Sequence, residues 1–419
     1  MFNLKSKVFA ALATVVCTTA ALAQDSGPLV DLLVKKGIIN NQEGEDLRAE
    51  LARDASAAVT ATISGGKSTA ALSISGRLQV QYAGLSTSID NAATQPIPTS
   101  HFFLRRVYLG AKANLGNGWS SSINYDFAGS TFDEAKITWA QSDLLNVDIG
   151  LRKVPFGLEE WYTSSGSLKA IERSPATRYF VESNNGRRLG AGSYRIGVYA
   201  GGKLDNGVFY NVAVTNPERN EDGTAGVTSA GNSTNNNLSY WANAGFKGKV
   251  GESLNYVVSG SYGLLPDQGG PSNTGLGKGD NISVYSLWGI VTSGPWDLEA
   301  EYFDGNDQHG VSLTQDAKPK AFWVQPSYKI TDNLEATVRY TEVYGGHRGV
   351  NLSDGIRSAP GGGAMKQMNE WYYGLTWFFR GNDTKLQVGY IHGESTDTVT
   401  GTAAKAKTDG IRSQMQVNF

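Results

Sequence analysis

Cysteine is almost absent from this chain, whose 419 residues contain a single one, Cys17. It lies in an N-terminal segment where Lys5 and Lys7 precede an apolar run that ends at Ala23. A positive start, a short apolar run and small residues at its end are typical of a secretory signal peptide, so residues 1–23 are predicted to be removed on export. The mature chain then has no cysteine, which excludes a fold held by disulfides.

Long apolar runs and an excess of positive charge are also missing. The run before Ala23 is shorter than the roughly 20 apolar residues of a membrane helix, and no later run reaches that length. Removing Lys5 and Lys7 from the 37 basic residues leaves 35 against 39 acidic ones, which is not a nucleic-acid-binding profile. An exported chain without membrane helices is either a secreted β-protein or an outer-membrane barrel, whose alternating strands keep the mean hydropathy low.

Helical periodicity is confined to the first part of the mature chain, residues 24–56. Leu29, Leu32 and Leu33 fall on one helical face there. The segment is too short to form its own core, so it is predicted to be a periplasmic helical segment. Residues 57–70 are rich in Ala, Ser, Thr and Gly and are predicted to be a linker.

From residue 71 to residue 419 apolar residues recur with a period of two, which predicts β-strands with one apolar face. Sixteen strands are predicted, at residues 71–84, 101–115, 118–128, 132–141, 145–152, 189–203, 207–216, 238–250, 254–263, 281–293, 296–304, 320–330, 334–344, 369–380, 384–392 and 409–419. Short connections alternate with long ones, and the long ones are 85–100, 153–188, 217–237, 264–280, 305–319, 345–368 and 393–408.

This alternation of connection lengths predicts an all-β fold, a 16-stranded antiparallel transmembrane β-barrel with short turns on one rim and long loops on the other. A soluble β-sandwich has no reason to segregate its loops in this way. Five tryptophans near predicted strand ends fit the aromatic girdles of such a barrel: Trp119, Trp139, Trp296, Trp371 and Trp377. The expected surroundings are outer-membrane lipid and lipopolysaccharide.

The last predicted strand alternates cleanly. Ile411, Met415 and Val417 share one face with Phe419, the terminal residue. An alternating strand that ends on an aromatic residue is typical of the strand that closes an outer-membrane barrel. Phe419 is therefore predicted to present this strand to the barrel-assembly machinery.

Strand alternation also predicts which charged side chains face the interior. Twelve basic residues have inward parity: Arg77, Arg106, Lys112, Lys136, Arg152, Arg195, Lys247, Lys249, Lys329, Arg339, Lys385 and Arg412. Seven acidic residues share it: Asp126, Glu134, Asp148, Asp297, Glu299, Glu301 and Glu335. A water-filled pore with excess Lys and Arg favours anions. The alternative is that charges of both signs only pair across the lumen and keep it wet.

The longest connection before the middle of the chain, 153–188, is too long for an ordinary loop. It is predicted to fold into the barrel mouth as a constriction loop, with Phe156, Gly157, Glu159, Glu160, Arg173 and Arg178 as its candidate residues. Lys153 is its first residue, directly after the predicted strand 145–152. Arg105 has outward parity but lies near the long-loop rim, where it is expected to twist inward beside Arg106.

Four motifs occur in a familiar order: Gly76-Arg77-Leu78-Gln79, Phe103-Leu104-Arg105-Arg106-Val107-Tyr108-Leu109-Gly110, Asn124-Tyr125-Asp126-Phe127 and Pro155-Phe156-Gly157-Leu158-Glu159. With them the chain resembles the phosphate-selective porin O and P family of Gram-negative outer membranes. The resemblance implies a homotrimer, a third long loop folded inward, and transport of small anions, phosphate or polyphosphate. It also implies a central anion site, which here would contain Arg77, Arg105, Arg106 and Asp126. Pore-lining partners by parity or position are Tyr108, Arg152, Lys153, Arg195, Arg339 and Arg412.

Two departures from the family pattern keep other functions open. Phosphate-selective members tend to have Lys directly after the Phe-Gly-Leu-Glu run, where this chain has Glu160. They also carry a row of arginines on the following wall, whereas residues 217–250 contain only Arg219 with Lys247 and Lys249. The alternatives are a general or weakly selective diffusion porin and a structural or adhesion barrel.

No motif predicts an enzyme or a cofactor. The four histidines lie in or beside predicted loops, which does not predict a metal site: His101, His309, His347 and His392. Glu159 and Glu160 are interpreted as loop carboxylates that pair with nearby arginines and not as an acid–base pair.

Overall fold

The structure is a computed structural model that describes residues 59–65, 68–217, 237–251, 253–270, 280–398 and 405–419. The predicted signal peptide and the predicted helical segment 24–56 lie outside the described residues. Within these ranges no helix is both long and apolar enough to cross a membrane.

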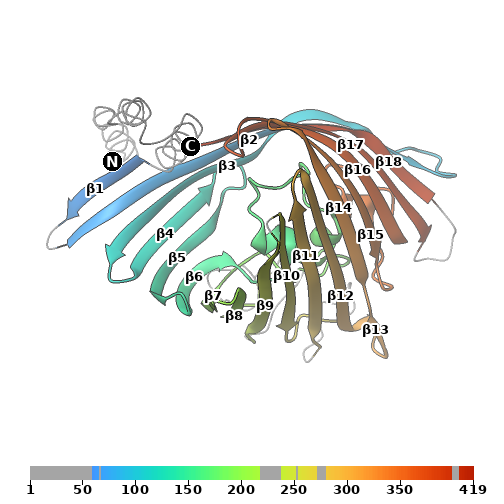
Figure 1. Ribbon diagram of the computed structural model, residues 1–419. Helices are drawn as coiled ribbons and strands as arrows, with labels where there is room; N and C mark the ends of the chain where they lie inside the picture. The colour runs from blue at the N-terminus through green and yellow to red at the C-terminus, as the bar shows by residue number, and fades with distance from the viewer. Residues whose placement is uncertain (1–58, 66–67, 218–236, 252, 271–279, 399–404) are drawn as a thin grey trace, which may run out of the picture.

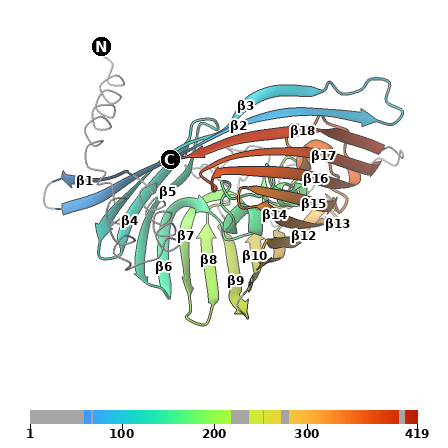
Figure 2. The ribbon, with the colours of Figure 1, turned by 45° about the horizontal axis from the view of Figure 1, so that its top comes forward.

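Sixteen antiparallel strands form a closed barrel, as predicted (Figure 1). They are β2 (Ser68–Ile89), β3 (Thr99–Gly116), β4 (Trp119–Asp126), β5 (Thr131–Ser142), β6 (Leu145–Lys153), β7 (Tyr194–Lys203), β8 (Val208–Thr215), β9 (Ser239–Val250), β10 (Leu254–Leu265), β11 (Ile282–Ser293), β12 (Trp296–Ser312), β14 (Lys320–Thr331), β15 (Leu334–Tyr344), β16 (Met365–Arg380), β17 (Thr384–Thr398) and β18 (Lys405–Asn418). Figure 2 shows β18 beside β2, and their pairing from Arg77–Asn418 to Ile89–Ala406 closes the ring.

Two further strands lie outside this ring of sixteen. β1 (Val59–Gly65) pairs with the first part of β2, and β13 (Gln315–Ala317) pairs with the end of β12. The predicted linker 57–70 is therefore wrong for residues 59–65 and 68–70. Its threonines, valine and isoleucine are β-branched and favour extended structure, which outweighs the small residues between them.

Several strands are longer than predicted, because their inter-strand backbone hydrogen bonds continue through polar residues beyond the apolar part of each strand. β12 runs to Ser312 and β17 to Thr398, well past the predicted ends at 304 and 392. β7 is shorter and begins at Tyr194 instead of residue 189. Backbone N–H groups of Leu189 and Ala191 instead bond to the carbonyls of Tyr179 and Phe180, at 3.0 and 2.8 Å.

The two faces of the wall differ as the period of two predicts. On β18, Ile411 is 52% exposed on the outer face while Arg412, its neighbour, is 1% exposed. All five tryptophans predicted for the girdles have exposed side chains. The outer face therefore presents apolar and aromatic groups, and the inner face presents polar ones.

The connection between β6 and β7, residues 154–193 (hereafter the β6–β7 segment), lies within the ring of strands (Figure 1). It contains a π-helix, η1 (Leu158–Tyr162), and a helix, α4 (Pro175–Val181), whose side chains are all buried. A second short helix, α5 (Leu352–Gly355), lies between β15 and β16 and contacts α4.

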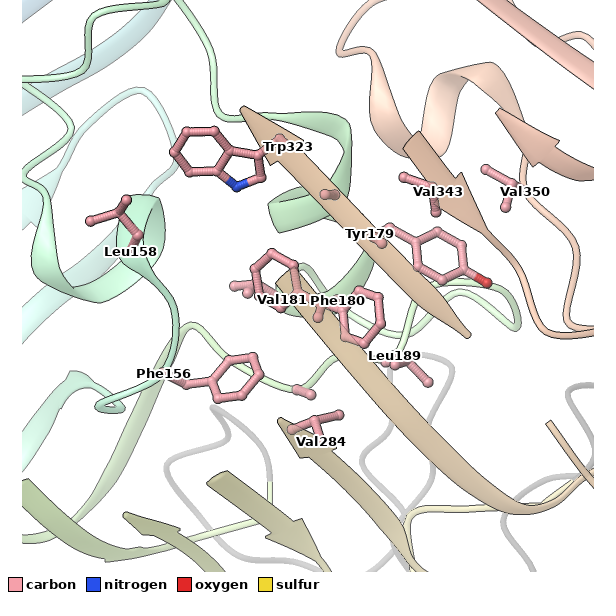
Figure 3. Packing of buried hydrophobic residues seen from close by; sticks show 14 of the residues in the cluster. Phe156, Leu158, Tyr179, Phe180, Val181, Leu189, Val284, Trp323, Val343 and Val350 are labelled. Carbon is pink, nitrogen blue, oxygen red and sulfur yellow. The ribbon is translucent and has the colours of Figure 1, made fainter. Parts of the chain in front are cut away.

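An apolar core fixes this segment to one side of the wall. Figure 3 shows Phe156 and Phe180 among residues of the neighbouring strands. The Phe303 ring on β12 lies 5.9 Å from Phe156 and 4.9 Å from Phe180, and both pairs are fully buried. Trp323 and Val343 continue this core along β14 and β15. The part of the lumen left to solvent is therefore on the opposite side.

Gly150 on β6 is expected to tolerate no side chain. Its φ is 131°, and a Cβ would lie 2.3 Å from the Ala135 carbonyl oxygen on β5. We expect Gly150→Ala to destabilise the barrel by about 1–3 kcal/mol, seen as a lower temperature for the heat-induced change in gel mobility. The matched control is Gly260→Ala, where the nearest atom to a Cβ is 3.9 Å away. Equal unfolding temperatures for the two variants would contradict this account.

Candidate functional site

The β6–β7 segment is held at its start by a buried carboxylate on β12. Glu301 accepts hydrogen bonds from the Leu158 backbone N–H at 2.8 Å, the Ser286 hydroxyl at 2.6 Å and the Trp323 indole at 3.1 Å. Gly157, with a φ of 84°, makes the turn into η1, and a Cβ there would lie 3.3 Å from the Glu301 carboxylate. The position of η1 is thus set by one glycine and one wall residue.

A second buried carboxylate, Glu159, joins η1 to α4 and to the wall. It accepts hydrogen bonds from the Ser174 backbone N–H and the Thr177 hydroxyl, both at 2.7 Å. The guanidinium of Arg339 on β15 lies 3.3 Å from Glu159 and 2.9 Å from Glu370 on β16. Since these charged side chains are at most 3% exposed, the pairing is dry and fixed in geometry.

Glu160 points to a different set of partners. Its carboxylate lies 2.9 Å from the Arg173 guanidinium and 3.7 Å from the Lys153 ammonium at the end of β6. Lys153 also donates to the Glu160 carbonyl at 2.5 Å. Two cations share one carboxylate here, so this contact keeps a surplus of positive charge.

Arg105 and Arg106 both point into the barrel, although neighbours on a regular strand face opposite sides. The β2–β3 register pairs Gln79 with Arg106 and then Val80 with Leu104. Arg105 is therefore the extra residue of a β-bulge, which turns its side chain inward.

These two arginines have different partners. Arg105 binds both oxygens of Glu172 at 2.5 and 3.1 Å, and Arg357, from the β15–β16 connection, binds the same carboxylate at 3.2 Å. Arg106 is 3% exposed and donates to the Gln79 side chain at 2.7 Å. Within the described residues no carboxylate forms an ion pair with Arg106, while Arg105 and Arg173 are among its charged neighbours.

These contacts define one group of charges, which we term the basic cluster: Arg105, Arg106, Lys153, Arg173, Glu160 and Glu172. Four cations face two carboxylates in it. A guanidinium with a free N–H edge next to other cations can bind an anion in a bidentate manner.

Next to the basic cluster is a cavity of about 1120 Å³, bounded by β2–β8 and by residues 161–165. Its basic lining residues are Arg77, Lys112, Lys136, Arg152, Lys153, Lys203 and Lys247. Its acidic lining residues are Asp133, Glu134, Asp143 and Asp148. The cavity is therefore polar, wide enough for hydrated ions, and richer in positive than in negative groups.

The model of the family described as phosphate-selective porin O and P matches residues 73–419. The chain belongs to this family. The porin therefore resides in the outer membrane. Both the family and the barrel fold suggest a channel.

Among curated proteins this porin is 23% identical over 292 residues to Porin O of Pseudomonas aeruginosa, a match covering 62% of this chain and 64% of that relative. Among solved structures it resembles the outer membrane channel DcaP of Acinetobacter baumannii, with a TM-score of 0.56 and 15% identity over 86% of this chain and 100% of that one. It also resembles the anion-selective porin from Comamonas acidovorans, with a TM-score of 0.52 and 12% identity over 82% and 99%. At such identities the structural likeness is one of fold.

The porin brings many of the predicted site residues together. Arg105, Arg106, Lys153, Glu160 and Arg173 meet in the basic cluster. Arg77, Tyr108 and Arg152 line the cavity beside it, where Arg77 donates to the Ser165 hydroxyl at 2.8 Å and Arg152 pairs with Asp148. Their role in anion binding stays a prediction.

Other predicted residues stabilise the barrel and its loops instead of facing this cavity. Asp126 accepts backbone N–H groups of Val107 and Ala128 at 3.0 and 3.1 Å, which fixes the turn between β4 and β5. Arg195 donates to the Gly190 carbonyl at 2.7 Å. Three more arginines donate hydrogen bonds to residues of the wall or loops: Arg178 to Glu182, Arg339 to Glu370, and Arg412 to Gln81.

Arg357 is the member of this charge network that sequence reasoning missed. It lies in a predicted loop, where strand parity gives no direction for a side chain. It reaches Glu172 and Glu182 of the β6–β7 segment, at 3.2 and 2.5 Å. Only the spatial approach of two loops brings these groups together. Within the described ranges no group of three His, Cys, Asp or Glu side chains could hold a metal ion.

The contact between the two loops is expected to survive moderate acid. Burial favours the neutral form of Glu172, but Arg105 and Arg357 outweigh it and hold the pKa of this carboxyl well below its usual value. A carboxyl with a lowered pKa in the folded state stabilises above its ordinary pKa and loses this effect only as pH falls through the lowered value. The contact between the two loops should therefore persist from about pH 8 to about pH 5, measured as unchanged cross-linking between cysteines placed in the two loops.

Arg357→Gln provides the control for this prediction. It removes one of the two guanidiniums that lower the Glu172 pKa, so the acid-induced loss of the loop contact should move to higher pH. Loss of cross-linking near neutral pH in the wild type, or a variant with the same pH profile as the wild type, would count against it.

Proposed function

We propose that this porin is a passive diffusion channel for small anions, with phosphate among its solutes. The observation that carries the proposal is the buried Arg106 guanidinium, which has no carboxylate partner in the described chain and stands beside Arg105 and Arg173. An anion in the cavity meets Lys153, which lines it, and the field of Arg106 and Arg173, which lie next to Lys153. Charge at a constriction sets ion selectivity more strongly than charge at a wide mouth.

The choice of phosphate rests on the chemistry of the cations. A guanidinium presents parallel N–H groups that match two oxygens of a tetrahedral oxyanion, whereas chloride can use only the charge. The family description and the resemblance of four motifs to that family point to the same solute.

Purified protein in a planar lipid bilayer tests this proposal. Under a KCl gradient the reversal potential should show chloride preference, and added phosphate should reduce the chloride current at low concentration. Cation preference would refute the anion channel. Chloride preference without a phosphate effect would refute phosphate as a solute and leave an anion channel of weak selectivity.

A general or weakly selective porin is the second candidate, and Glu160 is the observation that favours it. This carboxylate neutralises part of the charge of Lys153 and Arg173. We expect Glu160→Gln to leave both cations without this carboxylate and to raise the ratio of anion to cation permeability by several fold, measured from reversal potentials. Asp332→Asn, which removes an exposed carboxylate in the turn between β14 and β15, is the matched control. An unchanged ratio in Glu160→Gln would show that this carboxylate does not limit selectivity.

We further propose a homotrimer in which the flank around β4 and β8 contacts a neighbouring subunit. Each of these strands has eight residues, fewer than the roughly 9–11 that a tilted strand needs to cross the bilayer. Cover by another subunit would shield this short wall from lipid. Cross-linking in membranes should yield trimers. Contacts with lipopolysaccharide, and recognition of the strand ending in Phe419 by the barrel-assembly machinery, remain expectations.

A further inference from the structure

A group of aromatic side chains lies on the cavity side of η1. Tyr162 is at its centre: its ring is 4.6 Å from Trp288 on β11, 6.1 Å from Phe209 on β8 and 6.1 Å from Trp161. Trp161, Tyr162 and Phe209 line the cavity. Phe209 and Trp288 belong to the apolar core, and Trp161 and Tyr162 pack against it. The open volume beside Trp161, Tyr162 and Phe209 leaves part of their ring surface free for a ligand.

The local backbone accounts for how these rings reach the cavity. In η1 the Thr163 N–H bonds to the Leu158 carbonyl at 2.8 Å, five residues back, which widens the turn relative to an α-helix. Leu158 and the two glutamates after it are buried, whereas Trp161 and Tyr162 stay partly exposed. Single π-turns of this kind recur at functional sites.

A cation stands over the same rings. The Lys247 ammonium on β9 is 5.2 Å from the centre of the Tyr162 ring and 5.7 Å from that of Phe209. No carboxylate in the described part of the chain forms an ion pair with it. Two residues earlier on the same strand, Gly245 leaves space for the Phe209 ring, since a Cβ there would lie 2.2 Å from its outermost carbon. The wall is thus shaped to lay an aromatic ring flat beside a lysine.

We propose that this part of the cavity is a binding site for aromatic carboxylates. The carboxylate of the ligand would pair with Lys247, and its ring would lie against Tyr162 and Phe209. Inorganic anions and aliphatic acids could use only the ammonium, whereas an aryl acid gains ring contacts as well. A cavity of about 1120 Å³ is much larger than one benzoate, so binding stays weak enough for release, as conduction requires.

This inference rests on the proposed anion channel for the entry of the ligand, and its test is independent of phosphate. Benzoate and cyclohexanecarboxylate have the same charge and nearly the same size, but only benzoate has a π-system. Each is added to the wild-type channel in a planar bilayer while the chloride current is recorded. Benzoate should halve the current at a concentration about fivefold lower than cyclohexanecarboxylate does. Equal potency of the two acids would overturn the proposal.

Variants assign the effect to this site. Tyr162→Leu and Phe209→Leu should each reduce the benzoate preference, and Lys247→Gln should weaken both acids together. The matched control is Tyr285→Leu, which alters a tyrosine 55% exposed on the outer face of β11 and should retain the full preference. Retention of the preference in both ring variants would overturn the proposal, even if one of them assembled poorly. If phosphate does not block the chloride current of the wild-type channel but benzoate remains the more potent acid, phosphate is refuted as a solute and the aromatic-carboxylate site stands.

Discussion

Replacing Arg339 by Ala is expected to release the β6–β7 segment from the wall and to increase single-channel conductance and current noise. Arg339 binds Glu159 of η1 at 3.3 Å, the Glu172 carbonyl at 2.9 Å and the Glu370 carboxylate at 2.9 Å. Its loss leaves two buried carboxylates without their shared counter-ion. Breaking a buried pair in this way costs about 3–5 kcal/mol, which is comparable to what the two remaining hydrogen bonds of Glu159 contribute.

The barrel itself is expected to persist in this variant, since its ladders do not depend on Arg339. Heat-modifiable gel mobility should show that the strands still assemble, and bilayer recordings should show the larger, noisier openings. Arg339→Lys keeps the charge but loses the planar fork, so it should give an intermediate conductance. Wild-type conductance in Arg339→Ala would mean that the apolar core around Phe156 and Phe180 alone holds the segment.

Replacing Arg106 by Gln is expected to have the largest effect on selectivity. It removes a buried guanidinium that forms no direct ion pair with a carboxylate of the described residues, so the ratio of anion to cation permeability should fall several fold. Loss of hydrogen bonds to a charged ligand is worth about 1.5–3 kcal/mol. Phosphate block should therefore need roughly tenfold or more phosphate.

Two other replacements make this result specific. Arg106→Lys should preserve most of the anion preference while weakening phosphate block, because an ammonium keeps the charge but lacks bidentate geometry. Lys320→Gln removes a charge on the other face of β14, which is 53% exposed and pairs with Asp304, and should change neither quantity. A reversal potential and a phosphate block that are unchanged in Arg106→Gln would place the selective site elsewhere in the lumen.

The sequence by itself determined the barrel. A strand between lipid and water has a two-residue period, so the alternation of Ile411 with Arg412, repeated through the chain, specifies strands and the face of each residue. The alternation of short and long connections specified antiparallel neighbours and the strand count. Arg106 could be assigned to the lumen for the same reason.

Only the tertiary structure decided which side chains line the open lumen and which are held by loop contacts. The β-bulge at Arg105 breaks the two-residue period of β3, and the sequence of the strand alone does not predict it. Asp126 has inward parity, yet its carboxylate accepts hydrogen bonds from the backbone N–H groups of Val107 and Ala128. The aromatic group around Tyr162 combines two residues of a loop, Trp161 and Tyr162, with residues of β8 and β11.

The physical reason is the range of the interactions. Strand period is a local property, because each residue meets lipid or lumen according to its own position in the ladder. The contact of Glu159 with Arg339 joins residues 180 positions apart, and that of Glu172 with Arg357 joins residues 185 apart. Such pairs depend on where a loop comes to rest inside a closed ring, which a period of two does not encode. The sequence thus specified a wall with a basic interior, and the fold of the β6–β7 segment decided which of those charges face the open path.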